Sequence, residues 1–156
     1  MKTLEKLDKI DKQILKLMQE NGRITNIDLA NQVGISAPPC LRRVKALEDA
    51  GLIVSYHAEV DAKQLGYGVN IFAFVEMNNH TEEALATFEK TMKEWDVVLE
   101  YYMLAGDADY ILRIVAKDWE NYQSFLTKQL LIQPNVGHVK SVLSIRGYKN
   151  HTGIPL

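Results

Sequence analysis

Three basic side chains lie within four positions of one another: Arg42, Arg43 and Lys45. A guanidinium group donates two parallel hydrogen bonds, which suits a guanine edge or a phosphate. A lysine ammonium suits a phosphate as a point charge. The cluster therefore favours contact with a nucleic acid, although a basic helix face is equally typical of solvated surface.

The segment that carries this cluster has the pattern of a helix from Ser36 to Gly51. Its apolar side chains recur every three positions and are expected to face inward: Leu41, Val44 and Leu47. The opposite face then presents Arg42 for base readout, while Arg43 and Lys45 lie at the flanks as phosphate anchors.

Two further helices are expected before this one. The first begins at Asp8 and ends at Asn21-Gly22. The second begins at Thr25, with Asp28 as a capping-box partner, and ends at Gly34. Two short helices joined by a glycine turn after a longer helix form a helix-turn-helix, whose last helix enters the DNA major groove.

Ser36 is the expected N-cap of the third helix, but the usual partners of an N-cap hydroxyl are missing. The second and third helical positions hold Pro38 and Pro39, which have no N–H to donate. The hydroxyl is then free for a phosphate, or the prolines delay the helix start and leave Ser36 in the turn. Further phosphate candidates lie at the start of the second helix, where a helix dipole attracts anions: Arg23, Thr25 and Asn26.

Beyond Gly51 the pattern changes from helical to alternating, which indicates an extended linker and then a second domain. Strands are expected at 69–77, 98–105, 110–116 and 139–146, and helices at 81–95 and 118–131. This βαββαβ order is typical of a ferredoxin-like α+β domain, whose antiparallel sheet has both helices on one face. The predicted boundaries are 1–53 for the helix-turn-helix domain, 54–68 for the linker and 69–156 for the ferredoxin-like domain.

The first strand of the second domain is bulky on both faces. Ile71 and Val75 alternate with Phe72 and Phe74, so the sheet face away from the helices also favours burial. Another copy of the chain would supply the cover, and we expect a homodimer.

The loop Gly106-Asp107-Ala108-Asp109 has chemistry suited to an amino acid. Backbone amides beside a glycine suit an α-carboxylate, and carboxylates suit an α-ammonium group. The same composition is typical of an ordinary hairpin turn, which stays an alternative.

Composition and charge limit the other functions. The net charge of the 156 residues is −2, but residues 1–55 hold nine basic and seven acidic side chains, so the N-terminal end carries a small net positive charge. The single cysteine, Cys40, excludes an internal disulfide and favours a core residue over a redox sensor. No signal or membrane segment is apparent, so we expect a cytoplasmic protein.

The histidines do not have the spacing of metal ligands: His57, His80, His138 and His151. No glycine-rich phosphate loop follows a strand either. We therefore expect no catalysis, no metal and no cofactor. The rival interpretation is a metabolite-binding or catalytic oligomer whose N-terminal helices serve only assembly.

From about residue 7 to 148 the chain resembles the leucine-responsive regulator and AsnC (Lrp/AsnC) family of bacterial and archaeal regulators. The matching motifs occur in order along the chain: Leu7-Asp8-Lys9-Ile10-Asp11, Asn21-Gly22-Arg23, Val33-Gly34-Ile35-Ser36, Pro39-Cys40-Leu41-Arg42-Arg43-Val44, Leu47-Glu48, Gly51-Leu52-Ile53 and Gly106-Asp107-Ala108-Asp109-Tyr110.

The resemblance implies a sequence-specific transcriptional regulator with a winged-type helix-turn-helix, whose dimers assemble into octamers. It also implies control by a small amino acid bound between dimers, beside the loop from Gly106 to Asp109, with Val136 as a contributor. Double-stranded DNA and a second copy of the chain are the implied macromolecular partners. The candidate DNA-contacting residues are Arg23, Thr25, Asn26, Ser36, Pro38, Pro39, Arg42, Arg43 and Lys45.

The chain departs from the family pattern at two places. Ser36 is followed by Ala37 before the prolines, whereas the family more often has proline directly after the serine. Ala108 stands where relatives often carry an aromatic residue, which predicts an effector pocket that is wider, differently selective or not used at all.

Overall fold

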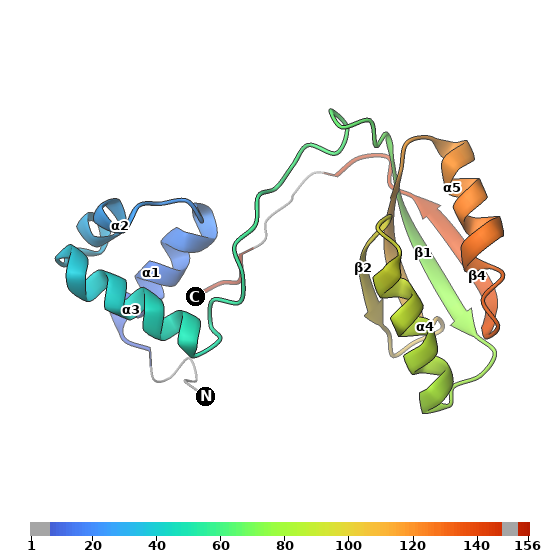
Figure 1. The fold of residues 1–156 in the computed structure, drawn as a ribbon, viewed down its shortest axis with the longest axis horizontal. Coiled ribbons are helices and arrows are strands. Elements are labelled where there is room, and N and C mark those ends of the chain that lie inside the picture. Colours follow the sequence, from blue (N-terminus) through green and yellow to red (C-terminus); the bar gives the residue numbers. More distant parts are fainter. Residues whose placement is uncertain (1–6, 148–152) are drawn as a thin grey trace. The chain divides into compact units, whose positions relative to one another are not determined.

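The computed structural model describes residues 7–147 and 153–156, which form two compact units (Figure 1). Of the described residues, 7–59 and 153–156 belong to the first unit and 60–147 to the second. The sequence pattern places 153–156 with the ferredoxin-like domain, whereas in the structure Ile154 contacts Gln19 of the first unit. The predicted 1–53 and 69–156 domains include residues that lie outside the described ranges. His151 is one of these residues.

The first unit contains α1 (Lys9–Glu20), α2 (Asn26–Val33) and α3 (Ala37–Asp49). The carboxylate of Asp8 accepts the Asp11 N–H at 2.8 Å, and the Thr25 hydroxyl accepts the Asp28 N–H at 3.1 Å. Both predicted N-caps are therefore confirmed. Gly34 ends α2 with φ at 74°, a left-handed conformation that favours glycine and gives the tight turn into α3.

The core of the first unit lies where the three helices meet. Its fully or nearly fully buried side chains come from every helix: Ile14, Leu15, Leu29, Ala30, Val33, Cys40 and Leu47. Cys40 is 0% exposed, which confirms its expected place in the core. Burial also raises the pKa of the Cys40 thiol, which lowers its reactivity.

One prediction about α3 is wrong: Leu41 does not face inward and is 58% exposed. A step of three residues turns a helix by about 300°, so a three-residue repeat drifts around the axis. The buried side of α3 is centred on Cys40 and Leu47, and this centre places Leu41 at the edge of the outer face. The alternative of a delayed helix start is also wrong, because α3 begins directly after Ser36.

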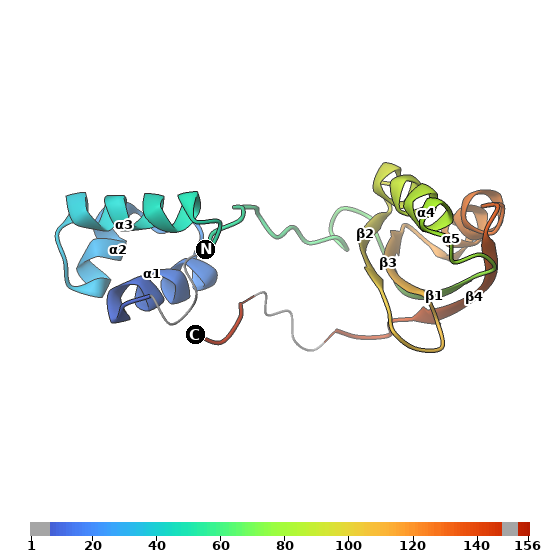
Figure 2. The ribbon, with the colours of Figure 1, turned by 90° about the horizontal axis from the view of Figure 1, so that it is seen from below.

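The second unit contains β1 (Val69–Met77), α4 (Glu82–Glu94), β2 (Val98–Met103), β3 (Tyr110–Ala116), α5 (Trp119–Phe125), the π-helical turn η2 (Leu126–Leu130) and β4 (Val136–Leu143). The four strands pair in the order β2-β3-β1-β4, and every pair is antiparallel. Figure 2 shows α4 and α5 on the same side of this sheet. The ferredoxin-like prediction is therefore confirmed.

The core of the second unit lies between the sheet and its two helices. Alternate residues of β1 and β3 are buried there, and α4, α5 and η2 cover them with Phe88, Met92, Tyr122, Phe125 and Leu130. β4 begins three residues earlier than the pattern predicts, because Val136 pairs with Met77 across a β-bulge at Glu76 and Met77.

The N-cap of α5 gives a testable prediction for stability. The Asp118 carboxylate accepts hydrogen bonds at 2.7 Å from the backbone N–H and the side-chain amide of Asn121, and these bonds lower the pKa of Asp118. Asp118→Ala should lower the midpoint of thermal unfolding by about 4 °C, whereas Asp118→Asn keeps a capping oxygen.

Acidification should separate Asp118→Asn from the wild type. Because the folded state lowers the pKa of Asp118, the stabilisation is present above the unfolded pKa near 3.8 and is lost as the pH falls through the folded value. Asp118→Asn should therefore lose less stability on acidification than the wild type in thermal melts. An equal acid response of both proteins would contradict the assigned cap.

Candidate functional sites

The outer face of α3 carries free cationic groups. Arg42 and Lys45 are exposed on the side opposite Cys40 and Leu47, and neither makes a hydrogen bond or ion pair within residues 7–147 and 153–156. Leu41 lies on the same face, so this surface combines charge with an apolar contact. Such a face suits a DNA groove, where arginine reads guanine edges and apolar groups meet thymine methyls.

Arg43 has a different environment from its neighbour Arg42. Its Nη1 lies 2.7 Å from Asp8 Oδ2 and 2.8 Å from Asp11 Oδ1, so it ties α3 to the start of α1. The hydrogen bonds to Asp11 and Asp8 raise the pKa of Arg43. The pKa of Asp8 is lowered, first by the Asp11 N–H and then by Arg43. The guanidinium is thus already paired inside the unit.

The turn residues differ in how far their polar groups are already used. Ser36 makes no side-chain capping bond, because the prolines at the start of α3 have no N–H to donate, and its hydroxyl has no partner within the part of the chain that the structure describes. Thr25 bonds Asp28, with 2.6 Å between Thr25 Oγ1 and Asp28 Oδ2. Asn26 Nδ2 donates to the Ala37 carbonyl at 2.9 Å and holds α2 against the start of α3.

The remaining candidates for DNA contact lie before α2 and in the first turn of α3. Arg23 is exposed, and its backbone N–H bonds Asn21 Oδ1 at 3.0 Å. Pro38 is exposed and Pro39 is half-buried in the first turn of α3. Among these candidates, the polar side chains that make no hydrogen bond or ion pair within residues 7–147 and 153–156 are Arg23, Ser36, Arg42 and Lys45.

In the second unit, the loop before β3 holds two aspartates with different surroundings. Asp109 Oδ2 accepts the Met77 N–H at 2.6 Å, and Asp109 Oδ1 lies 2.8 Å from His80 Nε2. Asp107 is exposed and makes no hydrogen bond or ion pair within the described ranges. Asp109 therefore links the loop to β1 by a hydrogen bond, while Asp107 is the carboxylate available to a ligand.

The hydrogen bond between Asp109 and Met77 lies at the end of the sheet where β4 begins with Val136. Val136 pairs with Met77, so two of the predicted effector residues approach the same β-bulge. The Asn78 side chain fills the space beside Gly137, because a Cβ at this position would collide with Asn78 Oδ1. Gly106 is exposed, Ala108 is half-buried, and both lie in the loop beside this end.

His80 is the partner that sequence reasoning missed. It lies 29 positions before Asp109, in the connection between β1 and α4, and no local motif joins the two residues. The only usable signal is the antiparallel pairing of β1 with β3, which brings the end of one strand to the start of the other.

The sheet face away from the helices carries an apolar stripe across all four strands. Phe74 lies opposite Ile111, which also pairs with Tyr102, and Phe72 lies opposite Val142. Tyr102 is 58% and Val142 42% exposed. This stripe is the surface for which the sequence predicts a covering subunit.

Two further properties bear on the class of site. Within residues 7–147 and 153–156, no three His, Cys, Asp or Glu side chains are grouped so that they could hold a metal ion. Among the same residues, every helix is too short or too polar to cross a bilayer.

Family models match both units of the chain. A model described as winged helix-turn-helix DNA-binding matches residues 7–54, and one described as the Lrp/AsnC ligand binding domain matches residues 70–154. The chain is 42% identical over 144 residues to the leucine-responsive regulatory protein of Rhizobium meliloti, covering 92% of each chain. It is 37% identical to the Bkd operon transcriptional regulator of Pseudomonas aeruginosa, covering 98% of this chain and 100% of the relative.

Solved structures show the same arrangement of elements. A transcriptional regulator from Neisseria meningitidis, solved in complex with L-methionine, is 34% identical, with a TM-score of 0.92 and coverage of 96% of each chain. An AsnC family transcriptional regulator from Agrobacterium tumefaciens is 32% identical, with a TM-score of 0.89 and coverage of 96% of this chain and 97% of the other.

Proposed function

Because the chain belongs to the Lrp/AsnC family of transcriptional regulators, we propose that it reads its operator with α3 and responds to a small amino acid at the loop before β3. Regulators of this family combine a DNA-binding helix-turn-helix with a ligand-binding domain and are not enzymes. What we add is the assignment of individual residues to these two tasks.

The observation that carries the DNA-binding proposal is the exposed Arg42 side chain on the outer face of α3, which has no partner within the described residues. We assign Arg42 to base readout, because its planar fork is unpaired and points away from the core. We assign Arg23, Ser36 and Lys45 to phosphates, since the side chain of each makes no hydrogen bond within the described residues and can donate to an anion. We assign shaping of the surface, through local hydrogen bonds or the helix start, to Thr25, Asn26, Pro38 and Pro39.

We propose a homodimer formed through the apolar stripe of Phe72, Phe74, Ile111, Tyr102 and Val142. Burial of these side chains against a second copy would remove exposed apolar area from water. Two copies of α3 then contact half-sites about 34 Å apart or a multiple of that distance. Association of such dimers into an octamer is the family arrangement that we extend to this chain.

For the effector we propose a small amino acid at Gly106, Asp107, Ala108 and Val136. The L-methionine bound by the Neisseria regulator makes methionine the first compound to test, followed by leucine. Asp107 would receive the ammonium group, while Asp109 positions the loop. We place the regulator in the cytoplasm, where bacterial operators lie, and keep 54–68 as the proposed linker.

The experiment that tests the function is selection of DNA sites from a random duplex pool with the full-length protein, followed by mobility shifts on the recovered sequence. A recurring paired motif whose affinity falls as salt rises is the expected result. Failure to enrich any motif, with equal retention of unrelated duplexes, would contradict sequence-specific binding.

A matched pair of loop variants tests the effector assignment. Asp107→Asn should weaken binding of the responsive amino acid by about fivefold through loss of one charge-assisted bond, with little change in melting temperature without ligand. Asp109→Asn should lower the melting temperature as well, because it alters the tie to Met77 and His80. Thermal-shift titrations measure both effects. Equal effects of the two substitutions on stability would contradict the separation of roles.

A further inference from the structure

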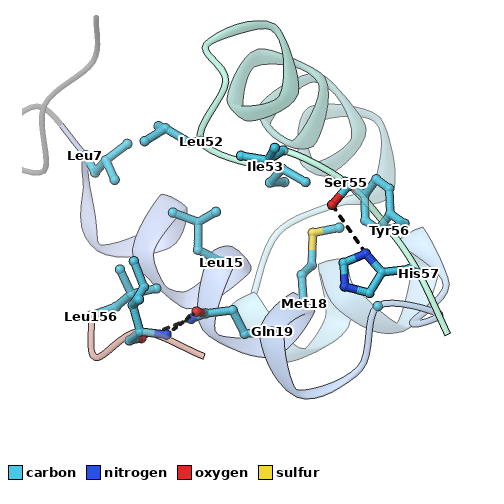
Figure 3. A pocket seen from close by; sticks show the side chains of 13 residues that line it. Leu7, Leu15, Met18, Gln19, Leu52, Ile53, Ser55, Tyr56, His57 and Leu156 are labelled. Carbon is cyan, nitrogen blue, oxygen red and sulfur yellow. Dashed lines mark hydrogen bonds between the residues drawn. The ribbon is translucent and has the colours of Figure 1, made fainter. Parts of the chain in front are cut away.

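The first unit has an apolar groove beside α1 that holds the 153–156 segment (Figure 3). Leu7, Leu15, Met18, Ile53 and Tyr56 line it, and we call this the docking groove. Ile154 and Leu156 lie along it and leave an open volume of about 340 Å³. The 153–156 segment therefore fills only part of the docking groove.

Gln19 holds the segment by its backbone. The Ile154 N–H donates to Gln19 Oε1 at 2.6 Å, and Gln19 Nε2 donates to the Ile154 carbonyl at 3.2 Å. One side-chain amide thus satisfies both backbone groups of a residue 135 positions away, as a neighbouring strand would. A Cβ on Gly153 would lie 3.3 Å from Gln19 Oε1, so glycine permits this close approach.

The opposite wall of the groove is held in place independently of the segment. The Tyr56 hydroxyl donates to Glu48 Oε1 at 2.7 Å. Burial and Glu48 raise the pKa of Tyr56 to about 12, so this donor keeps its proton at physiological pH. The ring also lies near Gly22, where a Cβ would be 3.8 Å from Tyr56 Cδ1. The groove therefore does not depend on the segment for its shape.

We propose that the 153–156 segment is a reversible strap that steadies the DNA-binding unit; this inference rests on the proposed function. The N-terminal part of the first unit ends at residue 59 and is connected to the sheet through 60–68, and docking adds a second connection through the chain that follows β4. Ile154 stays 69% and Leu156 39% exposed, so docking of the strap buries little apolar area and stabilises the docked state only weakly.

The consequence concerns DNA with two half-sites. Once one α3 of a dimer is bound, the second binds at an effective concentration set by how freely its unit moves. A docked strap restricts that movement and raises the effective concentration near the second half-site. Binding of one unit to one half-site does not depend on this restriction.

The test uses the full-length protein with Leu156→Asp, with Gln19→Ala and with residues 153–156 deleted. Leu131→Asp is the matched control, because Leu131 has a similar exposure of 44% and lies in the second unit. Hydrogen exchange over residues 15–20 reports docking. Affinities for duplexes with two half-sites or one, recovered by selection with the wild type, report its effect on binding.

We expect all three strap variants to exchange faster over residues 15–20 and to bind the paired site about three- to tenfold more weakly, with unchanged affinity for the single half-site. The Leu131→Asp control should show neither change. Unchanged exchange, equal losses on both duplexes or tighter binding to the paired site would each overturn the strap. A wild type that binds no DNA would refute the proposed function, while the exchange result would still report docking.

Discussion

Replacing Arg42 with alanine should weaken binding to the selected operator by about 1–3 kcal/mol, or roughly 5- to 150-fold. The guanidinium is exposed on α3, has no partner within the described residues and lies opposite the buried Cys40. Its removal would delete the proposed bidentate contact to a base without disturbing the core. Mobility shifts on the operator and on variants altered at one base pair would measure the loss at the affected position.

Lys45→Ala is the control on the same helix face. A lysine that contacts phosphate contributes alike to every sequence, so this variant should weaken all duplexes and reduce the slope of log affinity against log salt by about 1. Arg42→Ala should leave binding to unrelated DNA nearly unchanged. If Arg42→Ala weakened all duplexes equally, Arg42 would be a phosphate contact and base readout would lie elsewhere.

The elements themselves could be predicted because local chemistry determines where they begin and end. The Asp8 and Thr25 side chains start their helices by accepting hydrogen bonds from backbone N–H groups three residues later in the sequence. Gly34 ends α2 with a conformation that other residues rarely adopt. The strand from Val69 to Met77 shows the alternation of a buried sheet surface and matches β1 at both ends.

The sites depend on contacts that local patterns do not record. Leu41 is apolar and correctly spaced for a helical stripe, yet only the position of the neighbouring helices decides which of several apolar residues is buried. Asp109 meets His80 across a strand pairing, and Gln19 meets Ile154 from the other end of the sequence. Both contacts are polar and isolated, so no periodicity predicts them.

Arg42 and Arg43 show most clearly that local sequence patterns do not predict tertiary contacts. The two residues are adjacent and identical in type, and the sequence assigns both to DNA. In the structure Arg43 bridges Asp8 and Asp11, whereas Arg42 stays unpaired within the described ranges. The sequence does contain a signal for this bridge, since Asp8 and Asp11 both lie at the start of α1, but only the packing of α1 against α3 shows which arginine they meet.

Arg43→Ala should therefore lower the free energy of unfolding of the DNA-binding unit by about 2 kcal/mol. The substitution leaves Asp11, which is only 7% exposed, without its charged partner. Arg43→Lys should recover part of the loss, because an ammonium group reaches one carboxylate but lacks the fork that bridges two. Urea denaturation at neutral pH measures these differences, and Arg42→Ala should denature as the wild type does.

Removal of both charges separates the bridge from the effect of a shortened side chain. Asp11→Leu combined with Arg43→Met leaves no unpaired buried charge, so it should be closer to wild-type stability than Arg43→Ala alone. The pH dependence gives a second control. The folded state lowers the pKa of Asp8, so its stabilisation is present above about 3.8 and is lost as the pH falls through the folded value.

Since Arg43 supplies part of that lowering, the stability of Arg43→Ala should fall less steeply in acid than that of the wild type. One result would contradict this structural role of Arg43. If Arg43→Ala denatures as the wild type does but binds every duplex more weakly, Arg43 leaves its two aspartates to contact phosphate. Operator binding would then replace the bridge by a DNA contact and release Asp8 and Asp11 at the start of α1.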